Sequence, residues 1–289
     1  MAKMSITLTN PKILKFCVEA ISELTDEAVL KFDEESLTLS VMDSSRIGLA
    51  RLIMENHSFD DYHVYEEFKI PLNLEDLSKV MKRIGKDDTL KLTHDTDDLK
   101  ARITLEQEGK TRNFSLAMID LDYPDVPITN LLQIPYETQW TIDPDLILEA
   151  VRDAEIYDDV IQINADKNLT MRAWGTVGEM EYVLSPESLI TYDMERSATC
   201  AYGISYLKFI GKLKSITEKL EMSLIDDHPI KMIFYLLEGG KMFYFAAPRV
   251  AESEEVDEGE QQEDSSEAEK KDDIDEMFDE EAETVEAKE

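Results

Sequence analysis

The sequence predicts an α+β fold in which one unit of helices and strands occurs twice along the chain. Three observations support this fold class. Segments with apolar residues at helical spacing alternate with groups of strand-like segments. The pattern of residues 74–103 returns 130 positions later. A segment with three prolines, residues 120–135, interrupts regular structure between the two halves.

The first half is expected to begin with a helix and to continue mainly as strands. Apolar residues recur at helical spacing within residues 11–25, at Ile13, Leu14, Cys17, Val18 and Ile21. Alternating segments on both sides of a turn at 33–36 predict a β-hairpin. A second helix is expected over 73–85, with Asn73 as its N-cap and Gly85 as its stop. Further alternating segments predict strands at 89–95, 99–107 and 111–120.

The second half repeats this order of elements. Residues 142–174 again predict a helix, a strand, a turn and a strand. Residues 74–92 match residues 204–222 at one constant offset, so that Leu77 corresponds to Leu207 and Val80 to Ile210. Two similar domains are therefore expected, with the following boundaries: 1–119 for the first domain, 120–135 for the linker, 136–250 for the second domain and 251–289 for a tail.

The charge of the chain is unevenly distributed. The 289 residues carry a formal net charge of −34, and residues 251–289 alone hold 20 acidic and 3 basic side chains. Because this tail has few apolar residues, it is predicted to be disordered. Cys17 and Cys200 stand far apart and suggest no disulfide framework. No apolar run approaches the length of a membrane span, so a soluble intracellular protein is expected.

The sequence offers little that indicates catalysis or metal binding. None of the four histidines has a partner at metal-ligand spacing. Residues 108–111 resemble the end of a phosphate-binding loop, but Thr104 stands where its first glycine belongs, and a hairpin turn at Gly109 is the better interpretation. Asp120 and Asp122 are read as the solvent face of an extended linker. No enzyme activity, cofactor or metal is expected.

Basic residues concentrate on the predicted helices. In residues 74–86 they lie three or four positions apart, which places them on one helix face, and lysines recur in the matching segment 204–214. A charged outer face is also what an ordinary amphipathic helix presents. Because lysines recur at matching positions of an otherwise acidic chain, the pattern nevertheless favours a positive surface formed by the helices. Such a surface suits duplex DNA, which it binds without reading sequence.

Three blocks carry a resemblance to a known family. They are "LSVMDSSRIGL", "VYEEFKIPLNLEDLSKVMK" and "YFAAPRV". Over about residues 4 to 250 the chain resembles the sliding clamp of archaea and eukaryotes, proliferating cell nuclear antigen, in its archaeal form. The resemblance implies two similar domains per chain and a closed ring of three chains. Helices would line the inside of the ring, and sheets would form its outside.

The resemblance also implies a function. A homotrimeric processivity factor of DNA replication and DNA repair encircles duplex DNA and tethers polymerase, ligase and nuclease after a clamp loader has placed it. Two alternatives stay open. In the first, the chain is one subunit of a heterotrimeric clamp. In the second, it is an acidic interaction scaffold that never encircles DNA. The acidic tail has no counterpart in a typical family member.

The block around residues 42–49 implies a docking pocket for short partner motifs with aromatic anchors. Asp43, Ser44 and Ser45 would fix the backbone turn and take no part in chemistry. Ile47 and Leu49 can equally be core residues. Carried over by position, the pocket comprises Met42, Arg46, Ile47, Leu49, Leu121, Tyr123, Val126, Pro229, Phe245, Ala247, Pro248 and Arg249.

Two further sets of residues follow from the resemblance and from charge. The DNA-binding set is Lys15, Lys79, Lys82, Arg83, Arg152, Lys208, Lys212 and Lys214, of which Lys208 and Lys214 are added from charge alone. Contact between neighbouring chains is expected through residues 111–118 of one chain and 175–184 of the next. The contact residues are Phe114, Leu116, Gly178 and Met180.

The tail contains one cluster of large apolar residues, Ile274, Met277 and Phe278. Their spacing resembles that of the motif with which partners of the family dock. One hypothesis is that this cluster visits the docking pocket and competes weakly with partners, because about 24 linking residues average roughly 25 to 30 Å as a flexible coil. Truncation after Ala251 should then tighten partner-peptide binding a few-fold, and unchanged affinity would leave the tail as a charged solubilising segment.

Overall fold

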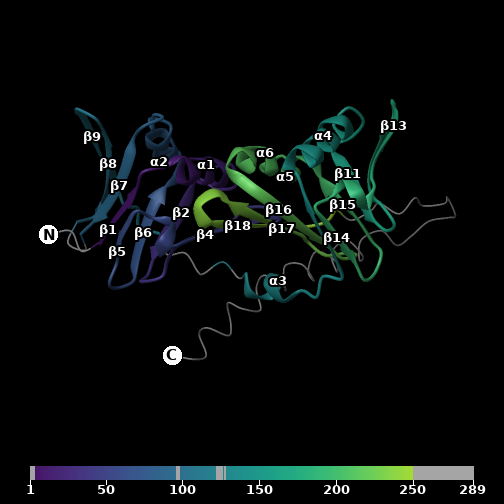
Figure 1. Ribbon diagram of the computed structural model, residues 1–289, viewed down its shortest axis with the longest axis horizontal. Coiled ribbons are helices and arrows are strands. Elements are labelled where there is room, and N and C mark those ends of the chain that lie inside the picture. Colours follow the sequence, from purple (N-terminus) through teal and green to yellow (C-terminus); the bar gives the residue numbers. More distant parts are fainter. Residues whose placement is uncertain (1–3, 96–97, 122–125, 127, 250–289) are drawn as a thin grey trace, which may run out of the picture. The chain divides into compact units, whose positions relative to one another are not determined.

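The computed structural model describes residues 4–95, 98–121, 126 and 128–249. The chain forms two compact units, which are described separately below (Figure 1). Unit 1 comprises Met1–Tyr123, Phe209–Glu221 and Met232–Tyr244, and unit 2 comprises Pro124–Lys208, Met222–Lys231 and Phe245–Glu289. The domain boundaries expected from the sequence stay a prediction.

Unit 1 contains a five-stranded antiparallel sheet. Its strand order is β5 (Asp61–His63), β1 (Met4–Leu8), β7 (Thr89–His94), β8 (Lys100–Gln107) and β9 (Lys110–Ala117). The predicted strands at 89–95, 99–107 and 111–120 are β7, β8 and β9. Gly109, with φ of 69°, forms the turn between the last two, as expected from the sequence. Glycine adopts this left-handed conformation without steric cost.

A second sheet of unit 1 contains the predicted hairpin. Strands β2 (Glu27–Phe32), β3 (Ser36–Met42), β4 (Gly48–Glu55) and β6 (Phe68–Asn73) lie in the order β4-β3-β2-β6. Later in the chain come β16 (Thr217–Leu224), β17 (Ile230–Leu236) and β18 (Lys241–Ala246). Buried and half-buried residues alternate along β2 and β3, because one face of the sheet meets the core and the other faces outward.

Helix α1 (Lys12–Ile21) contacts two other helices of unit 1. They are α2 (Leu74–Met81) and α6 (Phe209–Leu213). The predicted apolar stripe of α1 is buried, and each large apolar side chain so buried stabilises the fold by about 1.5 to 3 kcal/mol. Asn73 caps α2 as predicted, since its Oδ1 accepts a hydrogen bond of 3.0 Å from the backbone N–H of Asp76.

Unit 2 repeats the arrangement of helix and antiparallel strands. Its four-stranded sheet has the order β13 (Gly178–Leu184), β12 (Leu169–Gly175), β11 (Val160–Ala165) and β15 (Ala198–Gly203). Strand β10 (Thr138–Ile142) pairs with β14 (Thr191–Met194). The helices are α3 (Thr129–Gln133), α4 (Pro144–Ala154) and α5 (Ile204–Leu207). A short 3-10 turn of unit 2 lies at Pro186–Ser188, and those of unit 1 lie at Asn56–Ser58, Lys214–Ile216 and Leu237–Gly239.

The two matching segments of the repeat differ in their helices. Helix α2 is continuous, whereas the segment expected to match it contains two shorter helices, α5 and α6, with Lys208 between them. Asn73 caps α2 through its side chain, but the corresponding N-cap of α5 is Gly203, which has no side chain to offer. The predicted order of helix and strands is confirmed by β16 and β17, which correspond to β7 and β8.

One further difference concerns the linker. The prolines predicted no regular structure over 120–135, but α3 occupies Thr129–Gln133. This helix is too short to be stable alone, and Leu131 is fully buried, so tertiary packing is what holds it. Within the described part of the chain, no helix is long and apolar enough to cross a lipid bilayer.

Candidate functional surfaces

The predicted DNA-binding cations lie on or directly beside the helices of both units. In unit 1, Lys15 belongs to α1, Lys79 to α2 and Lys212 to α6. In unit 2, Arg152 belongs to α4, and Lys208 stands between the two short helices. Lys15 is half-buried, and the other seven cations of the set are exposed, including Lys82, Arg83 and Lys214. The helices therefore present their cations to solvent.

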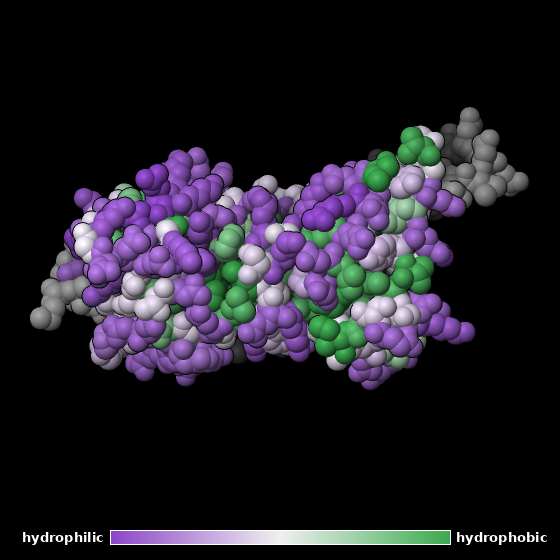
Figure 2. Space-filling model, turned by 45° about the horizontal axis from the view of Figure 1, so that its top comes forward, coloured by the Kyte–Doolittle hydropathy of each residue, from purple (hydrophilic) through white to green (hydrophobic). Residues whose placement is uncertain are grey.

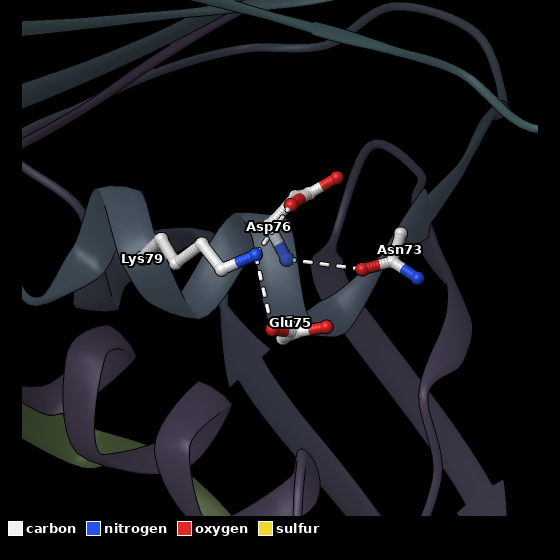
Figure 3. Close-up of polar contacts among 4 residues, drawn as sticks. All are labelled: Asn73, Glu75, Asp76 and Lys79. Atoms are coloured by element: carbon white, nitrogen blue, oxygen red, sulfur yellow. Dashed lines mark hydrogen bonds and ion pairs between the residues drawn. The ribbon is translucent and has the colours of Figure 1, made fainter.

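Carboxylates accompany several of these cations. The ammonium group of Lys79 lies 3.0 Å from Glu75 and 3.1 Å from Asp76, one helical turn away (Figure 3). The same two carboxylates raise the pKa of Lys79. Lys212 forms an ion pair with Glu23, and Lys208 forms one with Glu155.

The helices are accordingly less positive than the sequence suggested. Helix α4 bears Asp145, Glu149 and Asp153 against the single cation Arg152. The face seen in Figure 2 is largely hydrophilic, with several exposed apolar groups. Of the residues that the structure describes, no three or more His, Cys, Asp or Glu side chains are grouped to hold a metal ion.

The turn at Asp43–Ile47 satisfies its own polar groups, as predicted. The Oδ1 atom of Asp43 accepts hydrogen bonds from the backbone N–H groups of Ile47 (2.8 Å) and Gly48 (2.7 Å). Ser45 donates its hydroxyl proton to Oδ2 of Asp43 at 2.5 Å. Arg46 adopts φ of 55°, a left-handed conformation that is uncommon for a side chain of this size. Asp43 thus fixes the path of the chain between β3 and β4.

The other predicted pocket residues differ in exposure. In unit 1, Met42, Arg46, Ile47 and Leu121 are half-buried, whereas Leu49 is only 1% exposed and belongs to the core. The core interpretation therefore holds for Leu49 but not for Ile47. Tyr123 lies outside the described residues, as do Ile274, Met277 and Phe278 of the tail.

In unit 2, the segment after β18 is held by backbone contacts. The N–H of Arg249 donates to the carbonyl of Ala201 at 2.7 Å, and the hydroxyl of Tyr136 donates to the carbonyl of Pro229 at 2.6 Å. Arg249 is exposed. Val126 and Pro248 are half-buried, and Pro229, Phe245 and Ala247 are buried.

The predicted contact residues lie on two strands at sheet edges. Among the described strands, β9 ends one sheet of unit 1 and β13 ends one sheet of unit 2. Phe114 and Leu116 are half-buried on β9, and Met180 is half-buried on β13 beside the exposed Gly178. An edge strand presents unpaired backbone N–H and C=O groups to a further strand.

Comparison with known proteins identifies the family. The model of the proliferating cell nuclear antigen N-terminal domain matches residues 3–125, and that of the C-terminal domain matches residues 146–249. The chain belongs to the proliferating cell nuclear antigen family.

Relatives and solved structures agree with this membership. The DNA polymerase sliding clamp of Pyrococcus abyssi is 34% identical over 242 residues, covering 81% of this chain and 94% of the relative. That of Thermococcus fumicolans is 32% identical over 240 residues, with 81% and 93% covered. The structure of the antigen from Thermococcus kodakaraensis superposes with a TM-score of 0.79 at 24% identity, over 85% of this chain and all of that one. The expected clamp fold is confirmed.

This sliding clamp also contains an ion pair that the sequence did not reveal. Asp88, whose carboxylate is almost fully buried, accepts hydrogen bonds from the backbone N–H of Gly85 and from the guanidinium of Arg112 on β9. Arg112 also donates to the carbonyl of Arg83 at 2.9 Å. Burial alone would raise the pKa of Asp88, but the N–H of Gly85 and the guanidinium outweigh it and lower that pKa. Arg112 thereby joins β9 to the segment between α2 and β7.

The turn of the clamp leads to a prediction about stability and docking. Asp43→Ala removes three acceptor contacts, so it should lower the free energy of unfolding by about 2 kcal/mol. It should also weaken the binding of a partner peptide, because the backbone between β3 and β4 loses its fixed path. Denaturant unfolding and calorimetric titration measure the two effects. Ser44→Ala, at an exposed position of the same turn, is the matched control, and equal behaviour of the two variants would contradict the role of Asp43.

Proposed function

We propose that this clamp assembles as a homotrimeric ring that encircles duplex DNA and tethers replication and repair enzymes. The observation that carries the proposal is the family match across nearly the whole described chain, together with relatives named DNA polymerase sliding clamps. The ring acts on DNA inside the cell. It does not catalyse a reaction itself. We assign its domains to 1–119 and 136–250.

Ring closure is proposed to join β9 of one chain to β13 of the next. Both are edge strands, and adding one strand to another pairs their open backbone groups. Their charges are opposite, since β9 carries Lys110 and β13 carries Glu179. Because one chain supplies both edges, the contact is head-to-tail and generates a closed ring when its rotation closes.

Duplex DNA is proposed to contact the cations beside the helices. Long exposed lysines bind phosphates without a fixed register, which allows the ring to slide. Closure around the duplex keeps the clamp on DNA, so high affinity is not required.

Partner enzymes, including the polymerase, the clamp loader, ligase and nuclease, are proposed to dock through short hydrophobic and aromatic peptides. In unit 1 the half-buried Met42 and Ile47, presented by the rigid turn, offer apolar contacts. In unit 2 the segment that ends at Arg249 offers a second group of contacts for the peptide. Tethering raises the local concentration of each partner at the primer end.

Charge reversal tests the DNA-contacting surface. Replacing Lys79, Lys82 and Lys212 together by glutamate should reduce clamp loading and stimulated DNA synthesis, because attractive contacts with phosphate become repulsive. The reduction should be largest at low salt, where these charges are least screened. The variant should remain a folded trimer. Polymerase stimulation that survives all three reversals would show that DNA does not contact these helices.

Two measurements separate the proposal from its alternatives. Light scattering should give the mass of three identical chains, and a monomer that trimerises only with other subunits would indicate a heterotrimeric clamp. Retention on nicked circular DNA, with loss from linear DNA, should demonstrate encirclement. Equal retention on both would favour a scaffold that does not encircle DNA.

A further inference from the structure

Lys79, Lys208 and Lys212, which belong to the proposed DNA-contacting set, are already engaged by carboxylates of the same chain. Lys79 meets Glu75 and Asp76 within α2 (Figure 3), Lys212 meets Glu23, and Lys208 meets Glu155. All of these side chains are about half exposed or more, so the pairs stand in solvent where a phosphate can reach them. The ammonium side chains of Lys208 and Lys212 are 50% and 45% exposed.

Two of the carboxylates stand where helix stability does not favour them. Glu155 is the C-cap of α4, and Glu23 follows the C-cap Ser22 of α1. The C-terminal end of a helix carries partial negative charge, so an acidic side chain there is unfavourable for the helix itself. Each unit nevertheless places such a carboxylate against a lysine of the proposed DNA surface. Glu75 and Asp76 differ, since the first turn of α2 is a favourable place for acids.

An ion pair with a carboxylate changes how strongly a lysine attracts DNA. An ammonium group that neutralises a phosphate releases counterions from the duplex, and each such contact makes binding more dependent on salt. An ammonium group already neutralised by a glutamate contributes no net charge until that glutamate is displaced. The carboxylate therefore competes with the phosphate for the same cation.

We propose that Glu23 and Glu155, assisted by Glu75 and Asp76, act as built-in counterions that weaken the electrostatic grip of the clamp on DNA. They are positioning residues, since they hold the ammonium groups of Lys212, Lys208 and Lys79 and do not contact DNA themselves. The consequence is a ring that slides readily and whose contact with DNA changes little with salt. This inference rests on the proposed function, namely that these helices face the duplex.

The test compares the salt dependence of DNA binding in two variants of the full chain. Glu23→Gln/Glu155→Gln frees two lysines of the proposed surface. The matched control, Glu67→Gln/Glu137→Gln, removes the same charge and breaks two exposed ion pairs, with Lys69 and Arg196, away from the cations proposed for DNA. Affinity for a short linear duplex is measured by fluorescence anisotropy over a series of NaCl concentrations. Light scattering and thermal unfolding verify that both variants remain folded rings.

The first variant should bind the duplex about fivefold more tightly at low salt than the control. Its slope of log affinity against log salt should be steeper by up to about 1.8 for each chain of the ring that contacts the duplex, which is about 0.9 for each lysine set free. Adding Lys208→Gln and Lys212→Gln should return the slope to its original value, a result that a purely structural role of the glutamates would not give. Identical slopes in variant and control would overturn the inference while leaving the proposed DNA surface intact. Failure of every form to bind the duplex at any salt concentration would overturn that surface, and the inference with it.

Discussion

Phe114→Ala is expected to dissociate the ring into single chains at nanomolar concentrations. Phe114 is half-buried on the edge strand β9, where the next chain would cover it. A large aromatic side chain at the centre of an interface commonly contributes about 2 to 4 kcal/mol, which is roughly a 30- to 800-fold change in affinity at each contact. Multi-angle light scattering over a dilution series measures the shift from trimer to monomer.

Phe243→Ala is the matched control for this variant. Phe243 is also a half-buried phenylalanine, but it lies on β18, which belongs to neither of the sheets that β9 and β13 end. Its replacement should leave the mass of the assembly unchanged. If Phe114→Ala remained a trimer at nanomolar concentration, the contact between chains would have to lie elsewhere.

Arg112→Ala should lower the free energy of unfolding at pH 7 by about 3 kcal/mol. The buried carboxylate of Asp88 would lose its cationic partner and remain charged in a place with little access to water. The carbonyl of Arg83 would lose a donor as well. Denaturant unfolding measures the change. Arg102→Ala is the control, because Arg102, on the neighbouring strand β8, forms a more exposed ion pair with Asp98. Loss of that pair should change the free energy of unfolding by less than about 1 kcal/mol.

The difference between wild type and Arg112→Ala should depend on pH. The pKa of Asp88 is lowered in the folded clamp, so its ionised form contributes stability above the unfolded value of about 4. That contribution is lost as the pH falls through the folded pKa. The gap between wild type and variant should therefore be full at neutral pH and should shrink below about pH 4. A gap that stayed constant down to acid pH would mean that Asp88 is not the group that Arg112 stabilises.

Local spacing was sufficient to predict much of this fold. Helices α1 and α2 follow from apolar periodicity, and the cap at Asn73 follows from its side chain. The hairpin of β2 and β3 follows from alternation around a polar turn. Each of these features is determined within about ten residues of sequence, which is why a pattern reveals it. Helix α3 is different, because only the burial of Leu131 explains why so short a helix exists.

The functional surfaces also combine features set by neighbouring residues with features set by the packing of distant segments. The bonds that Asp43 makes within its own turn could be foreseen from the Asp-Ser-Ser sequence. The i to i+4 spacing of Glu75 and Lys79 was equally visible. No pattern indicates that Glu23 meets Lys212 or that Asp88 meets Arg112, since each pair depends on how distant segments pack. The sequence therefore revealed the cations but not the acids that reach them from distant segments.

The sheet edges at β9 and β13 have a consequence for how incomplete assemblies of the clamp behave. A linear row of any number of copies leaves one β9 and one β13 uncovered at its ends, and only a closed cycle leaves neither. Free ends recruit further copies, so a variant whose subunits meet at a slightly wrong angle should grow into filaments instead of stopping at three. The net charge of −34 on every chain opposes such growth through mutual repulsion. High salt, which screens that repulsion, is therefore the condition under which a defective ring should polymerise.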